Sequence, residues 1–423
     1  MERALAVVLA LCCVLSMSAA AVPLTESTPR AVERDTPPAA MPVVTVNDTT
    51  NYLDLNRSED VETEFGTPGI DVSASLATDT AATRGELDRR ALDRAYSEAE
   101  TTEERRAVLL GYTQRAENLT ADLRSSERRA LARFVAGQLS AERYLQTLAE
   151  LHVEAERTSA LLDRLATLQR RTDDAVPASR LNAVQADLVA LEGPVRDRLA
   201  SVYSGSESPE RVAVEATGTG VVLSVIVERD GRPVYVREAY LGEIREASSG
   251  EDQYGGIDDI QRRAEELYPW ASSDDFPTGS IRIDGLEEVY RFSTPHPQGE
   301  LTTFIDGQSD SVFREYQEKD LALVPVTEVE RGSEAGLELA VSRTYPGGPV
   351  LVETRAGDES VNATVTVDDE EVGTTGADGE RWVLMPSGDP VTVSATTPDA
   401  GPASVTVPRP EPDANVTVGS EGS

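Results

Sequence analysis

Cysteine and histidine are almost absent from this chain of 423 residues, which contains two of each. Cys12 and Cys13 both lie in an apolar run at the N-terminus, so a chain cleaved after that run would have neither a disulfide nor thiol chemistry. His152 and His296 have no second histidine at ligand spacing, so we expect no zinc or transition-metal site. We expect His152 on a helix surface or between helices, and His296, with a proline on each side, in a turn.

No stretch of the sequence carries a recognisable catalytic motif. A serine hydrolase would need a histidine to meet a serine and an acid, and no Gly-x-Ser-x-Gly sequence frames a serine. Gly218-Thr219-Gly220 leads into a predicted strand rather than a helix, which excludes a nucleotide loop. Pairs of acids such as Asp258-Asp259, Asp274-Asp275 and Asp368-Asp369 lack the spacing of a calcium loop, so we interpret them as solvated turns. We therefore predict no catalytic residue, no cofactor and no bound metal.

Lysine is nearly missing as well, because Lys319 is the only one in the chain. Asp and Glu number 75 against 39 Lys and Arg, which gives a net charge of −36. So acidic a protein repels nucleic acids and anionic membrane surfaces. At about 1 M salt the Debye length is about 3 Å, and the self-repulsion of such a chain is largely screened. This composition resembles that of proteins from extreme halophiles.

The N-terminus has the features of an export signal. Met1-Glu2-Arg3 precedes an uncharged run, and small residues follow at Ser18–Ala21, so we predict a signal peptide at residues 1–21. The alternative is an uncleaved anchor, since about 20 apolar residues can span a bilayer. Residues 22–83 are predicted to be a polar, mostly extended linker, with one strand that docks onto a later domain.

Five sequons for N-glycosylation accompany this signal and make some glycosylation of an exported chain an expectation. Their acceptor residues are Asn47, Asn56, Asn118, Asn362 and Asn415.

A helical pattern covers residues 84–205 and predicts a coiled-coil-like hairpin or bundle. A short helix at Glu86–Tyr96 is followed by one that opens with the capping box of Thr101 and Glu104. Ser140 is positioned to cap a third helix. A fourth should kink or split at Gly193-Pro194, because proline removes a backbone donor. Its apolar seam comprises Leu181, Val184, Leu188, Leu191, Val195, Leu199 and Val202. Such a seam either packs within the bundle or pairs with a partner helix or a second copy.

The hydrophobic period changes to two after the helices, and residues 209–325 are predicted to form an α+β antiparallel module. Asp230-Gly231 is a strong signal for a two-residue hairpin turn. A helix precedes Val289–Phe292, Leu301–Asp306 and Val312–Arg314, and this order resembles a PepSY-type domain, with Asp306-Gly307-Gln308-Ser309 as the Asp-containing turn. The resemblance implies a non-catalytic, peptidase-associated or interaction module.

Residues 337–408 are predicted to form a β-sandwich, and residues 409–423 a disordered tail. Val365–Asp369, Gly373–Gly379 and Met385–Gly388 resemble the transthyretin-like regulatory domain that accompanies some carboxypeptidases. That resemblance implies an accessory fold without catalytic residues.

Taken together, these features resemble exported multi-domain haloarchaeal proteins of unknown function. The predicted fold is multi-domain, with a helical bundle, then an α+β module, then an all-β sandwich. We expect a secreted or cell-surface, non-enzymatic scaffold or binding protein, whose partner is an extracellular protein or a surface component. Two other functions remain open: an extracellular hydrolase or regulator of a peptidase with accessory β domains, and a membrane-tethered sensor stalk that retains the N-terminal apolar segment.

Overall fold

The computed structural model describes residues 43–44, 51–56, 59–172, 175–247, 251–272, 282–385 and 390–408. These residues belong to one compact unit. The predicted signal peptide and C-terminal tail lie outside the described residues. Within the described ranges, no helix is both long and apolar enough to cross a membrane.

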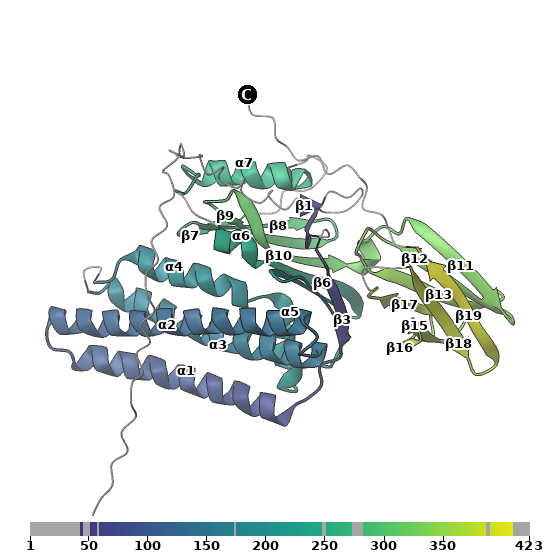
Figure 1. Ribbon diagram of the computed structural model, residues 1–423, viewed down its shortest axis with the longest axis horizontal. Helices are drawn as coiled ribbons and strands as arrows, with labels where there is room; N and C mark the ends of the chain where they lie inside the picture. Colours follow the sequence, from purple (N-terminus) through teal and green to yellow (C-terminus); the bar gives the residue numbers. More distant parts are fainter. Residues whose placement is uncertain are drawn as a thin grey trace, which may run out of the picture. The chain divides into compact units, whose positions relative to one another are not determined.

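Helices make up the first large part of the chain (Figure 1). The first of them begins at Val72, so the predicted linker to residue 83 was too long, and a helix of 27 residues replaces the short one expected at Glu86–Tyr96. The predicted break at Gly193-Pro194 is confirmed, with proline as the first residue of the last helix. The helices are α1 (Val72–Glu98), α2 (Thr102–Val135), α3 (Ala141–Gln169), α4 (Ala178–Leu188), the 3₁₀ turn η1 (Val189–Leu191) and α5 (Pro194–Tyr203).

Two helix starts illustrate what local sequence does and does not determine. At α2 the capping box is confirmed, because the Thr101 hydroxyl accepts from the Glu104 amide and the Glu104 carboxylate accepts from the Thr101 amide. Ser140 occupies the cap position of α3, but its hydroxyl makes no capping hydrogen bond. Glu64, from a strand far earlier in the chain, instead accepts from the Ala141 amide at 3.0 Å.

The central element is an eight-stranded antiparallel sheet with the order β3-β4-β5-β6-β10-β9-β8-β7. Its edge strand β3 comes from the predicted linker and pairs with β4, which confirms the expected docking strand. Asp230 and Gly231 both have positive φ (53° and 74°), as the predicted hairpin turn between β5 and β6 requires. The strands are β3 (Glu62–Gly66), β4 (Val212–Ala216), β5 (Gly220–Arg229), β6 (Arg232–Leu241), β7 (Arg282–Leu286), β8 (Val289–His296), β9 (Gly299–Asp306) and β10 (Ser311–Asp320). A separate pair, β1 (Val43–Val44) and β2 (Tyr52–Leu53), precedes them.

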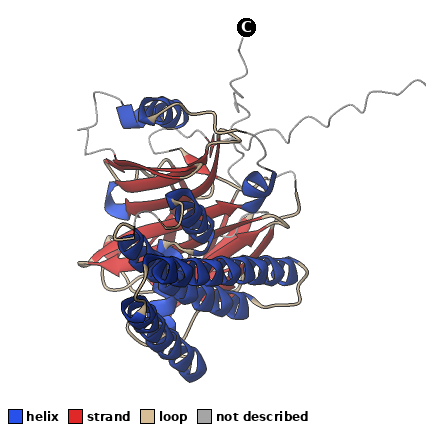
Figure 2. Ribbon diagram, turned by 90° about the vertical axis from the view of Figure 1, so that its left-hand side faces the viewer, coloured by secondary structure: helices blue, strands red, loops and turns tan. Residues whose placement is uncertain are grey.

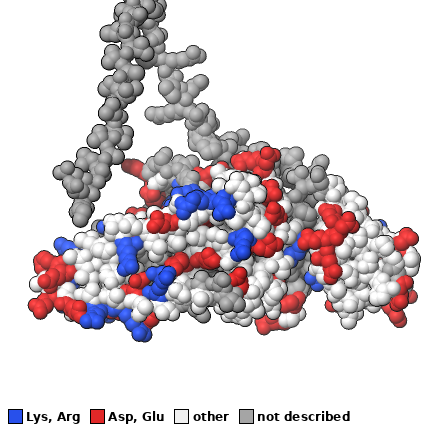
Figure 3. Space-filling model, turned by 60° about the horizontal axis from the view of Figure 1, so that its bottom comes forward, with Lys and Arg blue, Asp and Glu red and all other residues white. Residues whose placement is uncertain are grey.

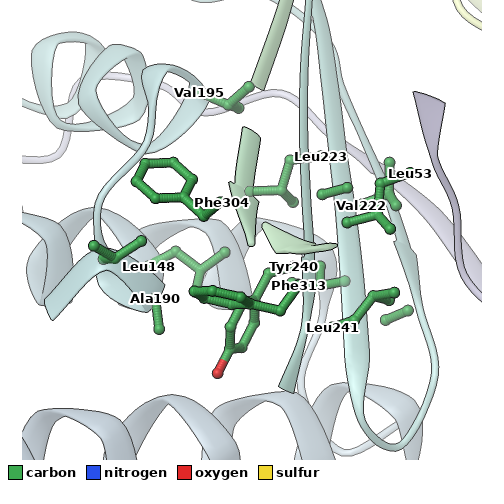
Figure 4. Close-up of a cluster of buried hydrophobic side chains, with 14 of the residues drawn as sticks. Leu53, Leu148, Ala190, Val195, Val222, Leu223, Tyr240, Leu241, Phe304 and Phe313 are labelled. Carbon is green, nitrogen blue, oxygen red and sulfur yellow. The ribbon is translucent and has the colours of Figure 1, made fainter. Parts of the chain in front are cut away.

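Helices cover both faces of this sheet (Figure 2). The helices α1–α5 lie on one side, and α7 (Ile257–Leu267) lies on the other, while the short α6 (Gly242–Ala247) follows β6. Leu148, Ala190 and Val195 from the helical part approach Tyr240 and Phe304 of the sheet in a single buried cluster (Figure 4). The helices and the sheet therefore share one hydrophobic core, which corrects the expectation of separately packed helical and sheet units.

The seam of the fourth predicted helix packs within the chain. Leu181, Val184, Leu188 and Leu191 are buried in a second cluster together with residues of α1, α2 and α3. Val195 and Leu199 enter the core shared with the sheet. The seam is thus filled by the protein's own helices and sheet.

The C-terminal part is a two-sheet β domain. One sheet contains β11 (Glu328–Glu334), β12 (Leu337–Arg343), β13 (Val350–Ala356), β14 (Glu359–Ser360) and β17 (Glu380–Val383). The other contains β15 (Thr364–Val367), β16 (Glu370–Thr374), β18 (Val391–Thr397) and β19 (Ala400–Val407). The buried hydrophobic cluster of this domain consists of valine, leucine and alanine, and Thr354 and Thr375 are buried as well. The sequence prediction missed β11, which precedes the expected start at Leu337 and pairs with β12.

Candidate functional site: buried polar clusters on both faces of the central sheet

The face of the sheet that is covered by α1–α5 carries a buried ionic cluster. The Glu238 carboxylate lies 2.6 Å from Arg314 and 2.8 Å from Arg196, and Arg196 also lies 2.6 Å from Glu127. These side chains have exposed fractions between 0% and 6%, so solvent does not screen the interactions. The cluster joins α2, α5, β6 and β10.

Glu238 also fixes the start of α5. The Val195 amide donates to Glu238 Oε2 at 3.2 Å, so a carboxylate of the sheet satisfies a free amide of the first turn. Arg314 in turn donates to the Glu192 carbonyl, just before the break in the helix. The split at Gly193-Pro194 therefore creates a helix N-terminus directly over a buried carboxylate.

On the opposite face, the sheet holds residues 51–55, which we call the strap. The Leu53 amide donates to Glu315 Oε2 at 3.0 Å, and the Leu53 carbonyl accepts from Arg237 at 2.6 Å. Gln317 donates to the Asn51 carbonyl at 2.6 Å. Side chains of β6 and β10 thus bind the main chain of the strap, much as a domain binds an extended peptide.

Lys319 lies in the same row of alternate β10 residues as Glu315 and Gln317 and is fully buried. Burial lowers the pKa of Lys319 to about 7, although the nearby Glu315 opposes this shift. Burial likewise raises the pKa of Glu315, against the effect of Arg237. Tyr268 donates to Glu315 at 2.6 Å and supplies a hydrogen bond that the carboxyl group needs in this environment.

Several contacts connect this face with the C-terminal β domain. Tyr52 of the strap donates to the Pro346 carbonyl at 2.7 Å. The Lys319 ammonium lies 4.1 Å from the centre of the Tyr345 ring, a cation–π geometry. Arg211, just before β4, pairs with Glu370 of β16 at 2.6 Å.

The two histidines are both buried. His152 lies on α3 and faces α5, in agreement with an interhelical position. His296 is the last residue of β8 rather than a free turn residue, and its ring lies 5.3 Å from that of Trp270. Burial, and then the charge of Lys319, lower the pKa of His296 to about 3, so the ring is neutral at physiological pH.

One group of residues departs from the expectation that no metal ligands converge. Among the described residues, His152, Glu156 and Asp197 each offer a ligand atom, and these atoms lie within 4.8 Å of one another. The predicted acid pairs do not join this group. Asp258 and Asp259 lie in the first turn of α7, Asp368 and Asp369 form the turn between β15 and β16, and Asp274-Asp275 lies outside the described residues.

The glycosylation candidates differ in accessibility. Asn118 on α2 and Asn362 before β15 are exposed, while Asn56 is half-buried. Asn47 and Asn415 lie outside the described residues.

The Asp306 turn is built as an Asx turn at the end of β9. Asp306 Oδ1 accepts from the amides of Gln308 and Ser309 at 3.1 and 2.8 Å, and Oδ2 pairs with Arg245. The Asp306 carboxylate thus holds the turn in place and links it to Arg245.

Sequence reasoning did not find the residues of the two buried clusters. Arg314 to Asp320 is a mostly polar run that begins in a predicted strand and extends beyond its predicted end, and such a run is also typical of a solvent-exposed edge. The one available signal for a special environment in this strand was Lys319, because it is the only lysine in a chain whose other cationic residues are arginine and histidine. The partners of these residues come from distant parts of the chain.

The fold thus defines a class of protein: a helix-covered antiparallel sheet followed by a β-sandwich. Three family models match successive stretches of the chain. They are a domain of unknown function (DUF7096) over residues 1–208, a family of unknown function (DUF7094) over residues 212–325, and an archaeal fibronectin-III type-like domain over residues 328–401. No curated protein and no solved structure matched the chain.

These matches make the chain a multi-domain protein of archaeal type with a C-terminal β domain. The β domain is fibronectin-III-like, and none of the three descriptions is of the PepSY or carboxypeptidase-regulatory type. The boundary between the first two matches falls between α5 and β4, although residues on either side of it share one core.

Proposed function

We propose that this protein is a secreted or cell-surface scaffold or binding protein, without enzymatic activity and adapted to high salt. The observation that carries the proposal is the use of its buried charges. Glu238, Arg314 and Arg196 connect the helices to the sheet, and Arg237 and Glu315 connect the strap to its other face. Groups engaged in this way hold elements together and are not free for turnover.

The C-terminal domain is the part best suited to binding. Its core is mostly apolar, and its match is to an archaeal fibronectin-III type-like domain. A sandwich held mainly by apolar packing can present its remaining outer surface to an extracellular protein or surface component. The helical seam of α4 and α5 is already filled, so self-association would have to use another helix face.

The surface charge supports the proposal that the protein functions at high salt. Asp and Glu side chains are visible over both the helical part and the C-terminal domain, with fewer Lys and Arg among them (Figure 3). The net charge of −36 disfavours nucleic acids as partners. Screening at about 1 M salt would remove most of the self-repulsion.

The test is to express the untagged full chain in a halophilic archaeal host and to separate medium, envelope and cytoplasm at high salt. We expect the protein in the medium or envelope, with a mass that lacks residues 1–21 and carries glycan on Asn118 or Asn362. If the apolar segment remains, the membrane-tethered alternative is favoured instead. A chain confined to the cytoplasm would refute the proposal.

The same preparation tests the absence of catalysis. Peptide, ester and glycan substrates should remain intact at high salt. Turnover that disappears when one residue is replaced would make the protein a hydrolase. Carboxylate-directed crosslinking on intact cells would then identify the surface partner.

A further inference from the structure

A buried histidine faces two acids where α3 and α5 meet. His152 has an exposed fraction of 3%, and neither of its ring nitrogens has a hydrogen-bond partner among the described residues. Its Nε2 lies 3.7 Å from Glu156 Oε1 and 3.7 Å from Asp197 Oδ1. A buried imidazole without a hydrogen bond is costly, so this arrangement requires an explanation.

The distances from His152 Nε2 to the two carboxylate oxygens are too long for hydrogen bonds. They suit ligand atoms that bind one ion together. A hydrogen bond from a ring nitrogen to a carboxylate would be about 2.7–3.2 Å long. Two ligand atoms bound tetrahedrally to one Zn²⁺, each about 2.1 Å from the metal, lie about 3.4 Å apart. The two 3.7 Å distances from His152 are close to this value. The two carboxylates lie within 4.8 Å of each other and are exposed, so their side chains would move closer together on binding an ion.

The backbone explains why these three side chains converge. Glu156 follows His152 by one turn of α3, so both project from the same face of the helix. Asp197 lies in the first turn of α5, which begins at Pro194 after the break in the helix. The break in the helix therefore places the Asp197 carboxylate next to Nε2 of the His152 ring.

A fourth polar group strengthens the case for a cation. Glu192 interacts electrostatically with His152 and Glu156 and contacts Ser159, and its buried Oε1 has no hydrogen-bond partner among the described residues. A divalent ion would offset the negative charge gathered around the imidazole.

We propose that His152 Nε2, Glu156 and Asp197 bind a divalent transition-metal ion of the Zn²⁺ class, with water in the remaining position. One imidazole with two carboxylates is a donor set that suits Zn²⁺ or Mn²⁺ better than Ca²⁺, which prefers oxygen alone. His152 Nδ1 lacks the carbonyl or carboxylate partner that strengthens tight sites, so the ion exchanges readily. The ion would link α3 to α5 at the edge of the shared core.

The two histidines of the chain allow a direct test. Untagged protein, ¹⁵N-labelled at histidine only, gives ring signals from His152 and His296 alone. Zn²⁺ is titrated at about 1 M salt, where the Debye length is about 3 Å and diffuse binding to surface acids is suppressed. We expect saturable shifts at one histidine, assigned to His152 by loss of its signals in His152→Gln, with Nε2 as the ligand.

Three variants distinguish Zn²⁺ binding at this site from non-specific Zn²⁺ binding by surface carboxylates. Glu156→Gln and Asp197→Asn alter exposed side chains of nearly unchanged shape, and each should weaken Zn²⁺ binding at least 10-fold by calorimetry. Asp163→Asn removes another exposed carboxylate of α3, about 16 Å further along the helix, and should leave the affinity unchanged. Unshifted His152 signals, or equal affinities in all three variants, would overturn the proposal.

Discussion

Arg314 of β10 and Glu238 of β6 form an ion pair at 2.6 Å, with exposed fractions of 0% and 1%. Their strands are neighbours in the sheet, and Tyr240 and Tyr316 flank the guanidinium group at 5.4 and 5.1 Å. Because the pair also contacts Arg196 and the start of α5, it is the point at which the helical part and the sheet are joined electrostatically.

Loss of the carboxylate charge at this point should be strongly destabilising. Glu238→Gln leaves two buried guanidinium groups with less compensation, and such a break typically costs about 3–5 kcal/mol. Urea unfolding at high salt measures the change in the free energy of unfolding. Glu318→Gln is the matched control, since its pair with Arg229 is partly exposed and should contribute less than about 1 kcal/mol. Equal effects of the two variants would contradict the role given to the buried cluster.

Gly193 should not tolerate a side chain. A Cβ built there would lie 2.1 Å from Glu238 Oε2 and 2.7 Å from Arg314, so Gly193→Ala must displace the buried pair. We expect a loss of about 1–3 kcal/mol, as for other overpacked sites. Gly111→Ala in α2 is a control of opposite sign: nothing lies within 4 Å of its Cβ, and alanine should stabilise the helix by about 0.5–1 kcal/mol. Thermal unfolding of both variants decides the matter, and a neutral Gly193→Ala would disprove the proposed clash.

Lys319 should make stability rise with pH above neutrality. The unfolded chain keeps this proton up to about pH 10.5, whereas the folded protein releases it near pH 7. Between these values the unfolded state binds more protons, so the free energy of unfolding increases by up to about 1.4 kcal/mol per pH unit. Below pH 7 both states are protonated, and the residue adds no pH dependence.

Denaturant unfolding between about pH 7 and 9.5 measures this slope, and the upper limit avoids the titration of tyrosines. In Lys319→Met the slope should disappear. A wild-type protein whose stability is flat across this range would show that the Lys319 ammonium is not desolvated as described.

The strap should contribute substantially to stability. Leu53 has an exposed fraction of 0%, and its amide and carbonyl are both bound by side chains of the sheet. Leu53→Ala should therefore cost about 2–5 kcal/mol through lost burial and cavity formation. Leu76→Ala, at a position with 66% exposure on α1, should change stability by less than about 0.5 kcal/mol. If the strap contributed little to stability, the two variants would show the same change in the free energy of unfolding.

Salt should stabilise the folded protein. Raising KCl from about 0.1 M to about 1 M shortens the Debye length from about 10 to about 3 Å, which weakens repulsion among the excess acids. We expect the melting temperature to rise over this range. Tetramethylammonium chloride should act similarly if screening is the cause. A melting temperature that falls in both salts would argue against adaptation to high salt.

Local signals in the sequence predicted local structure well. The capping box of Thr101 and Glu104, the break at Gly193-Pro194 and the hairpin turn at Asp230-Gly231 each depend on residues that are adjacent or one turn apart. The change of hydrophobic period after α5 likewise predicted that strands follow the helices.

Long-range relationships escaped the same reasoning. Glu64 caps α3 across 77 positions, and Gln317 binds the Asn51 carbonyl across 266. The periodicity of a helix or strand does not reveal such partners. The polar residues of β10 give the same sequence pattern whether they are exposed to water or paired with a buried guanidinium group. The shared core and the group around His152 were missed for the same reason: both arise only when α5 is placed against the sheet and against α3.

The burial of Lys319 has a practical consequence for the study of this protein in cells. Its amine lies inside the fold, so reagents that acylate primary amines would find no side chain to modify on the native protein. Amine-to-amine crosslinking could therefore link this protein to a neighbour only through its N-terminal amine. Tryptic peptides would end almost exclusively at arginine, and the appearance of a modified lysine peptide would be a direct report of unfolding.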